Sequence, residues 1–246
     1  MTRYKLTIEY DGTDFVGWQR QDNGPSIQAA LERAVEMFCG ERTTLYAAGR
    51  TDAGVHALGQ VAHLDIEKPA DAATLRDALN FHLKPQPIAV LAAEAVGADF
   101  HARFSARSRS YLYRIVNRRA PLALDRGRAW FVPQPLDSTA MSEAAGALVG
   151  HHDFSSFRAA DCQAKSPVKT LELLKVMCDG CDIRVAATAR SFLYHQVRIL
   201  VGTLKQVGEG KLDRSAVVRI LAARDRREAG PTAPACGLYF LEVEYE

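Results

Sequence analysis

The sequence has few of the features that mark a secreted scaffold or a membrane protein. Its 246 residues include five cysteines, an odd number in a chain too long to depend on a disulfide framework. No segment approaches the run of about 18 apolar residues that a membrane-spanning helix needs. The first residues have the pattern of a strand rather than that of a signal peptide. We therefore expect the protein to act in the reducing cytoplasm.

An excess of charge of one sign is missing as well. The 31 basic and 29 acidic residues give a net charge of +2, so the overall balance indicates no polyanionic partner. A nucleic-acid site would have to be a local concentration of arginine. Low-complexity segments and short repeats are also absent, and the hydrophobic content of 48% is typical of a globular protein.

What is present is a mixture of strand and helix patterns along the whole chain. Alternating apolar residues predict strands at about 3–10, 43–48, 60–66, 88–96, 107–117, 169–178, 181–189 and 237–245. Apolar spacing and capping residues predict helices at about 27–38, 71–82, 138–149, 192–207 and 213–223. Gly150 is the expected terminator of the third helix, and Asp179-Gly180 is a hairpin signal.

Hairpin-like links and one-sided helices favour an α+β fold over a doubly wound parallel sheet. We expect a mostly antiparallel sheet with helices packed on it, in two similar halves at residues 1–105 and 106–246. Each half carries a helix that starts at a serine or aspartate and ends at a glycine, which is a weak sign of internal similarity.

The segment AAGRTDAGVHALGQ, residues 47–60, carries the strongest sign of chemistry. Its three glycines permit unusual backbone conformations and the close approach of a substrate. Asp52 in this loop would stay ionised beside Arg50, because a near cation lowers the pKa of a carboxylate, and would suit a nucleophile or base. Asp and Gly also dominate turns, and local composition alone favours a turn residue. No Gly-Lys-Ser/Thr follows, so a phosphate cradle is not indicated.

A second constellation spans residues 100–119 and combines arginines with aromatic residues. No acidic residue occurs between Asp99 and Asp125. The arginines are Arg103, Arg107, Arg109, Arg114, Arg118 and Arg119, interleaved with Phe104, Tyr111 and Tyr113. In a strand, Arg109, Tyr111 and Tyr113 would share one face. The pattern favours phosphate pairing with base stacking over the alternative, an edge strand protected by charge.

A third piece, residues 191–208, predicts a core-facing helix with Arg198 among its apolar positions. A charge there needs a partner, and Asp52 would be a natural complement. The alternative is an arginine whose head reaches the surface while its stem packs on the core.

Together these segments resemble the bacterial tRNA pseudouridine synthase A family. The similar pieces occur in the family's order across almost the whole chain: IEYDGTDFVGWQRQ, AAGRTDAGVHALGQVAHLD, FHARFSARSRSYLYRI, HDFSSFRA, FLYHQVRILVGTLKQVG and TAPACGLYF. The run from Gly49 to His56 is highly specific for this family.

The resemblance implies the pseudouridine synthase fold, with an active-site cleft between the halves. It assigns the catalytic carboxylate to Asp52, the tyrosine that stacks on the target uracil to Tyr111, the arginine that helps expel the base to Arg50, and the basic partner of the aspartate to Arg198. It also implies a homodimer that binds the anticodon stem-loop of tRNA, modifies uridines at positions 38, 39 and 40, and uses no cofactor or metal. Arg103, Arg107 and Arg109 are the further candidates for binding RNA.

Two other functions fit parts of the sequence. A non-catalytic RNA-binding module would explain the arginine–tyrosine strand alone. A metal-dependent hydrolase would use Asp52, His56 and His63. Cys178-x-x-Cys181 suggests zinc, but the pair flanks a hairpin signal and no second close pair exists. The run His151-His152-Asp153 is expected to lie in a loop and to bond locally.

Overall fold

The computed structural model describes residues 1–245, which fold into two compact units. The first unit comprises Met1–Arg107 together with the C-terminal stretch from Tyr239, and the second comprises Ser108–Leu238. The halves expected from the sequence, 1–105 and 106–246, remain a prediction about internal similarity. By its contacts, the final strand packs with the first unit.

The first unit is built on a sheet of four long strands in the order β4-β1-β3-β10, with a short strand β2 paired to β3. The strands are β1 (Thr2–Tyr10), β2 (Tyr46–Ala47), β3 (His56–Ile66), β4 (Ile88–Val96) and β10 (Leu238–Glu244). Every pairing among them is antiparallel except that of β10 with β3.

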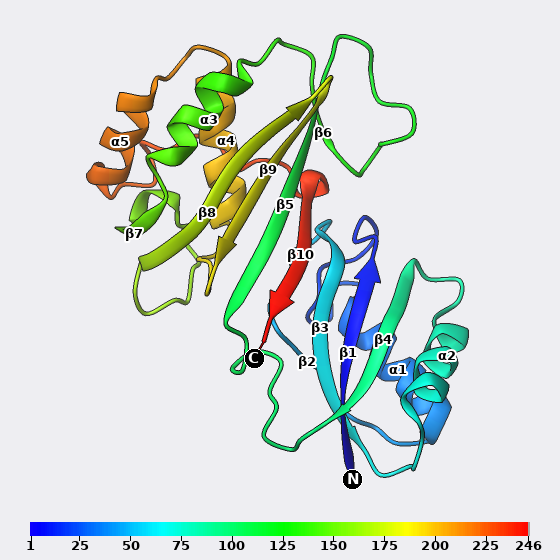
Figure 1. Cartoon of the computed structure of the whole chain (residues 1–246). Coiled ribbons are helices and arrows are strands. Elements are labelled where there is room, and N and C mark those ends of the chain that lie inside the picture. The colour runs from blue at the N-terminus through cyan, green and yellow to red at the C-terminus, as the bar shows by residue number, and fades with distance from the viewer. Residues whose placement is uncertain (246) are drawn as a thin grey trace. The chain divides into compact units, whose positions relative to one another are not determined.

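Two helices, α1 (Ile27–Cys39) and α2 (Ala72–Leu83), lie on the same side of these strands (Figure 1). The Ser26 hydroxyl accepts a hydrogen bond from the Ala29 amide, and Gly40 ends α1 at a φ of 77°. On β1, Tyr4, Leu6, Ile8 and Tyr10 are buried, while the alternate residues are partly or fully exposed. The predicted period of two therefore places one face of the strand in the core.

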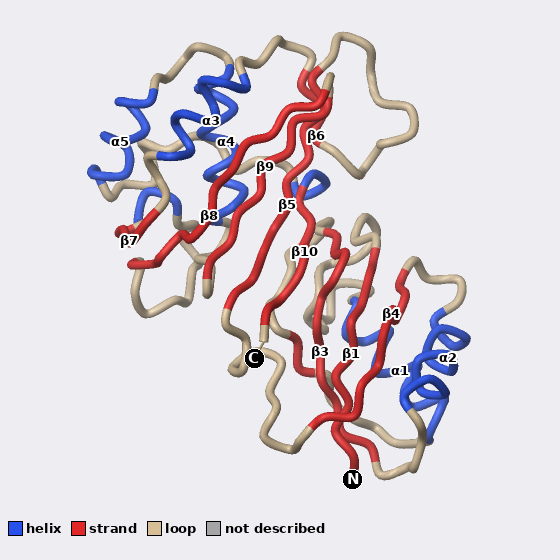
Figure 2. Tube along the Cα trace, in the orientation of Figure 1, coloured by secondary structure: helices blue, strands red, loops and turns tan. Residues whose placement is uncertain are grey.

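The second unit contains a sheet in the order β5-β9-β8-β7, with β6 paired in parallel to β5. Its strands are β5 (Ser108–Asn117), β6 (Trp130–Val132), β7 (Gly150–Asp153), β8 (Val168–Asp179) and β9 (Asp182–Ala189). The other pairings are antiparallel. Figure 2 shows the long loop that joins β5 to β6.

Three helices, α3 (Ser138–Gly146), α4 (Gln196–Gly208) and α5 (Arg214–Ala223), are grouped together in this unit (Figure 1). Helix α3 packs on β8, and α4 packs on β5 and α3. On β9, Ile183, Val185, Ala187 and Ala189 are buried. Mixed elements and mostly antiparallel pairing confirm the α+β prediction.

Several predicted boundaries were wrong for identifiable reasons. Helix α3 ends at Gly146, and Gly150, at a φ of 121°, begins strand β7 instead of ending the helix. His151, His152 and Asp153 consequently lie in that strand rather than in a loop. The hairpin turn falls one residue later than predicted, since Asp179 pairs with Asp182.

Two further elements start elsewhere than their patterns indicate. Helix α4 begins at Gln196 rather than near residue 192, because His195 adopts a left-handed φ of 59°. Strand β3 begins at His56 rather than near residue 60, so it starts only four residues after Asp52.

Candidate active site

Asp52 lies in the loop between β2 and β3, and this loop is clamped by the loop that follows β1. An isolated antiparallel bridge joins Gly17 to Asp52. The Trp18 amide donates to the Thr51 carbonyl at 3.0 Å, and the Gly54 amide donates to the Phe15 carbonyl at 3.3 Å. These backbone attachments on adjoining residues fix the direction in which the half-buried Asp52 side chain leaves the chain.

Glycines make this approach of two backbones possible. A Cβ on Gly12 would lie 1.9 Å from the Val55 oxygen. A Cβ on Gly17, whose φ is +113°, would lie 2.6 Å from the Thr51 oxygen. Between the predicted strand at 3–10 and the predicted helix at 27–38, the sequence indicates only a long loop over residues 11–26 and does not reveal that this loop forms the clamp. The signal that could have found it is the glycine pair in DGTDFVGW.

Arg50 stands apart from this clamp. Its side chain is exposed and makes no hydrogen bond or ion pair with any residue in the described range 1–245. Arg50 therefore forms no ion pair with Asp52, although the two residues lie two positions apart in the same loop. The guanidinium is available to a ligand.

The histidines that the hydrolase hypothesis would use accept hydrogen bonds from backbone amides, and His56 Nδ1 also lies 3.1 Å from Asp11 Oδ1. His56 Nδ1 accepts from the Gly12 amide at 3.0 Å, and His63 Nδ1 accepts from the Ala102 amide at 3.2 Å. Burial is the main reason that the pKa of His63 falls to about 4. Over residues 1–245, no group of three or more His, Cys, Asp or Glu side chains is arranged to hold a metal ion. No helix in that range is long and apolar enough to cross a membrane.

In the second unit, Tyr111 and Tyr113 share a face of β5 as predicted, but their environments differ. Both pair in regular register with β9, opposite Ala187 and Val185. Tyr113 is fully buried, and its hydroxyl donates to the Pro234 carbonyl at 2.7 Å. Burial raises the pKa of Tyr113 strongly. Tyr113 is thus a core residue.

Tyr111 is only half-buried. Its ring meets the ring of Phe192 edge to face, with centroids 5.1 Å apart. Such an edge contact holds the ring in one orientation while leaving part of its surface exposed. Of the two tyrosines, Tyr111 is the one that can offer a flat wall to a ligand.

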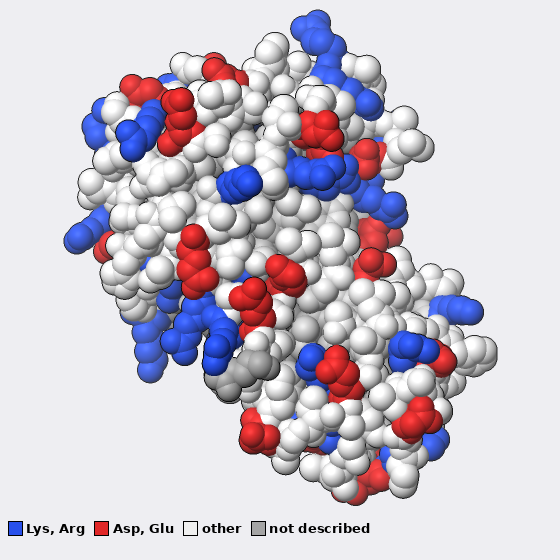
Figure 3. Space-filling model, in the orientation of Figure 1, with Lys and Arg blue, Asp and Glu red and all other residues white. Residues whose placement is uncertain are grey.

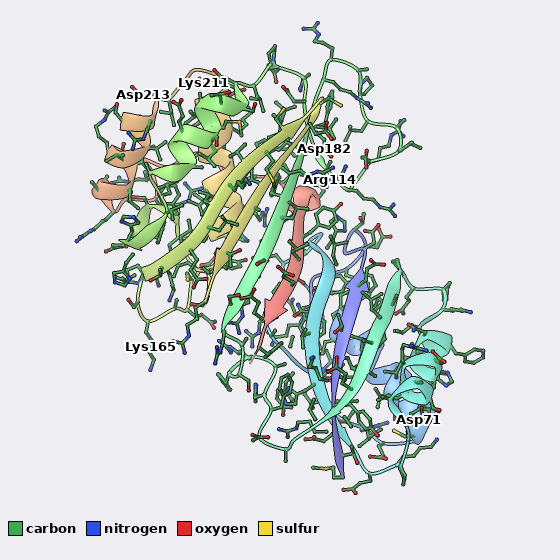
Figure 4. All side chains as sticks on the ribbon, in the orientation of Figure 1. Asp71, Arg114, Lys165, Asp182, Lys211 and Asp213 are labelled. Carbon is green, nitrogen blue, oxygen red and sulfur yellow. The ribbon has the colours of Figure 1, made fainter. Side chains whose placement is uncertain are left out.

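The arginine run is less uniform than its sequence indicates. Arg114 forms ion pairs with Asp125 at 3.3 Å and with Asp182 at 3.5 Å, and Figure 4 shows Arg114 and Asp182 side by side. Arg109 is 9% exposed and donates from Nη1 to the Arg190 carbonyl. The absence of acidic residues within the run therefore does not leave Arg114 without counter-ions, because its acidic partners come from other parts of the chain.

Other arginines of the run remain at the surface. Arg103 and Arg107 are exposed in the first unit, and the Arg103 guanidinium lies 5.6 Å from the centre of the Phe104 ring. Arg118 is exposed in the second unit and donates to the Ala120 and Pro121 carbonyls. On the face drawn in Figure 3, basic and acidic side chains are interspersed, so positive charge is local on this face rather than general.

Arg198 lies in the first turn of α4 and is half-buried. Its Nε donates to the Ala233 carbonyl at 2.7 Å, and the Ala233 amide donates to the Arg198 carbonyl at 3.1 Å. The neighbouring segment packs tightly on the helix, because a Cβ on Gly202 would lie 1.8 Å from the Pro231 oxygen. The guanidinium is consequently anchored rather than mobile.

Comparison with known proteins identifies the fold. The model of the tRNA pseudouridine synthase family matches residues 6–105 and 144–246. The chain belongs to this family. Family membership confirms both the resemblance read from the sequence motifs and the pseudouridine synthase fold expected from it.

Full-length relatives support the same family assignment. The protein named tRNA pseudouridine synthase A from Paramagnetospirillum magneticum is 64% identical over 245 residues, covering 100% of this chain and 96% of that protein. Its namesake from Rhodospirillum centenum is 63% identical over 245 residues, with 100% of both chains covered. The one from Parvibaculum lavamentivorans is 58% identical over 246 residues, also covering both chains fully.

The synthase family model covers the candidate residues unequally. Asp52 and Arg50 lie in its first matched segment and Arg198 in its second. Tyr111 falls in the stretch between the two segments. The full-length relatives span that stretch, so the similarity extends through β5 as well.

Proposed function

We propose that this chain isomerises uridine to pseudouridine in tRNA, with Asp52 as the catalytic carboxylate. The observation that carries the proposal is the clamped Asp52 loop in a chain of the tRNA pseudouridine synthase family. The reaction breaks the bond between ribose C1′ and uracil N1 and forms a bond from C1′ to C5. The proton on C5 is lost and N1 gains one, so no electrons are exchanged with a cofactor.

The chain's residues suit the needs of this reaction. The target uridine has to leave its stack, which costs a few kcal/mol and requires a site to receive the base. We assign Tyr111 to the wall against which the uracil lies, since its ring is held by Phe192 and partly exposed. Arg50, exposed within the Asp52 loop, is the residue proposed to help expel the base.

The remaining arginines are proposed to bind the RNA. Arg103 and Arg107 are exposed and suited to phosphate contacts. Arg198 and Arg109 are anchored to backbone carbonyls, so we propose that they act at fixed positions on the substrate. Fixed groups lose little freedom on binding and therefore contribute more per contact.

The substrate range follows from the resemblance in sequence. We propose the anticodon stem-loop as the region bound, positions 38, 39 and 40 as the targets, a homodimer as the active form and the cytoplasm as the location. Mapping pseudouridine in tRNA treated with the purified protein tests the targets, and sedimentation of the protein alone tests the dimer.

Tritium release from tRNA labelled at uridine C5 tests the reaction. Wild type should release tritium with EDTA present, and Asp52→Asn should release none while binding tRNA as well as wild type does. Failure of wild type to release tritium would leave only an RNA-binding role. Loss of release in EDTA would instead indicate a metal-dependent enzyme.

A further inference from the structure

A chain of buried polar groups lies directly beneath the Asp52 loop, within the first unit. The Tyr10 hydroxyl lies 2.7 Å from Thr51 Oγ1. Gln60 Nε2 donates to the Gly49 carbonyl at 2.8 Å and approaches the Tyr10 oxygen at 3.5 Å. Tyr10 is 2% exposed, Gln60 0% and Thr51 6%. These groups thus contact the loop on both sides of Arg50, at Gly49 and at Thr51.

Burial of these polar groups needs a reason, because apolar residues fill the middle of the same layer on β1. Leu6 and Ile8, on the same face of the strand, are completely buried. A buried amide or hydroxyl costs free energy unless it is hydrogen-bonded, and even then its net contribution to stability is small. Two apolar side chains in place of Tyr10 and Gln60 would give comparable stability. The polar groups are therefore better explained by the loop that they hold in place.

What it holds is the peptide that carries Asp52. The Thr51 side chain is tied from below by Tyr10, and the Thr51 carbonyl is tied from the side by the Trp18 amide at 3.0 Å. With both the side chain and the carbonyl of Thr51 fixed, the peptide linking it to Asp52 has no freedom to rotate. The backbone position from which the Asp52 side chain projects is constrained accordingly.

We infer that Tyr10 and Gln60 are positioning residues for Asp52, holding its loop through Thr51 and Gly49. The inference depends on the proposed catalytic role of Asp52. Displacement of a reacting group by about 1 Å can lower a rate by about 100-fold, so a support of this kind acts on the chemical step more than on binding.

The protonation of Tyr10 suits this role. Burial raises the pKa of Tyr10 to about 12, so its hydroxyl keeps its proton throughout the neutral range. Gln60 approaches as a donor to the Tyr10 oxygen, and the Tyr10 hydroxyl shares a further hydrogen bond with Thr51 Oγ1. The hydrogen bonds among Tyr10, Gln60 and Thr51 therefore do not change with pH near 7.

The chain offers a matched control for the test. Tyr4 lies on the same face of β1, is also 2% exposed, and bonds through its hydroxyl to the Ala70 carbonyl, away from the Asp52 loop. Tyr10→Phe keeps the ring and its packing near Trp18, whose centroid lies 6.2 Å away. Tyr4→Phe removes an equivalent buried hydroxyl from the same strand.

The two variants should differ in kcat. Tyr10→Phe should lower kcat by about 10- to 100-fold with the KM for tRNA within about twofold of wild type, while Tyr4→Phe changes neither. Both should lower the melting temperature to a similar extent. If the two variants have the same kcat, the inference is overturned, because the Tyr10 hydroxyl would then contribute only to stability.

A second pair keeps the test decisive if Tyr10→Phe folds poorly. Thr51→Val removes the hydroxyl that Tyr10 contacts, and Thr51→Ser restores it. The loss of kcat should appear in Thr51→Val and be largely rescued in Thr51→Ser; equal losses would contradict the inference.

Asp52→Asn is measured alongside these variants. If it stays active, the proposed catalyst is wrong, whereas an inactive Asp52→Asn beside a fully active Tyr10→Phe overturns the positioning role alone.

Discussion

The loop that carries Asp52 and the strand that carries Tyr111 are held in place by different means. The loop has little regular pairing and depends on glycines that let a second loop approach it, with Tyr10 and Gln60 below. The strand is in unbroken antiparallel register with β9 from Arg109 to Val116. In the loop, a few irregular contacts hold one side chain, so a single substitution can displace it. In the strand, a regular hydrogen-bond ladder holds every residue, and the exposure of each side chain decides whether it can contact a ligand.

The contrast is sharpest within the strand itself, between its two tyrosines. Tyr111→Ala should lower kcat/KM by roughly 5- to 150-fold through lost stacking on the uracil, with little effect on folding. Tyr113→Ala should reduce the free energy of unfolding by about 3–5 kcal/mol, because it empties a fully buried site. Tritium-release kinetics and denaturant titration measure the two effects. A large stability loss in Tyr111→Ala would mean that both tyrosines are core residues.

The clamp can be tested with two glycines that both have positive φ. Gly17→Ala should reduce the free energy of unfolding by about 2–3 kcal/mol and lower kcat, since its Cβ would press on the Thr51 carbonyl. Gly40→Ala should cost only about 1 kcal/mol and leave kcat unchanged, because a Cβ there meets nothing within 4 Å. Denaturant titration with a tritium-release assay separates them. Equal effects in the two variants would show that backbone strain, not the close approach, is what matters.

The smallest expected effect concerns the arginines. Arg103→Ala and Arg107→Ala should each weaken tRNA binding and reduce the slope of log affinity against log salt by about 1. Arg114→Ala should leave that slope unchanged, because ion pairs with Asp125 and Asp182 already engage its guanidinium. Binding curves at several salt concentrations provide the measurement. A reduced slope in Arg114→Ala would mean that tRNA phosphates displace Asp125 and Asp182 from the Arg114 guanidinium.

Local physics made much of the fold predictable. The alternation of β1, the hydroxyl of Ser26 at the start of α1 and Gly40 at its end each act through neighbours in sequence. The predicted boundaries failed where a single backbone conformation intervened, as at His195, or where a short edge strand replaced a loop, as at His151. Such short elements depend on a partner strand that no local pattern reveals.

The candidate site divides in the same way. The sequence by itself determined the motif around Asp52, the arginine–tyrosine alternation of β5 and, through them, the family. Only the tertiary structure decided that Tyr113 is core while Tyr111 is partly exposed, that Arg114 pairs with Asp182, 68 residues away, and that Tyr10 contacts Thr51. Alternation and capping are fixed by bonded neighbours. Burial, ion pairing and buried hydrogen bonds depend on which distant segments meet, and that is set when the sheets assemble.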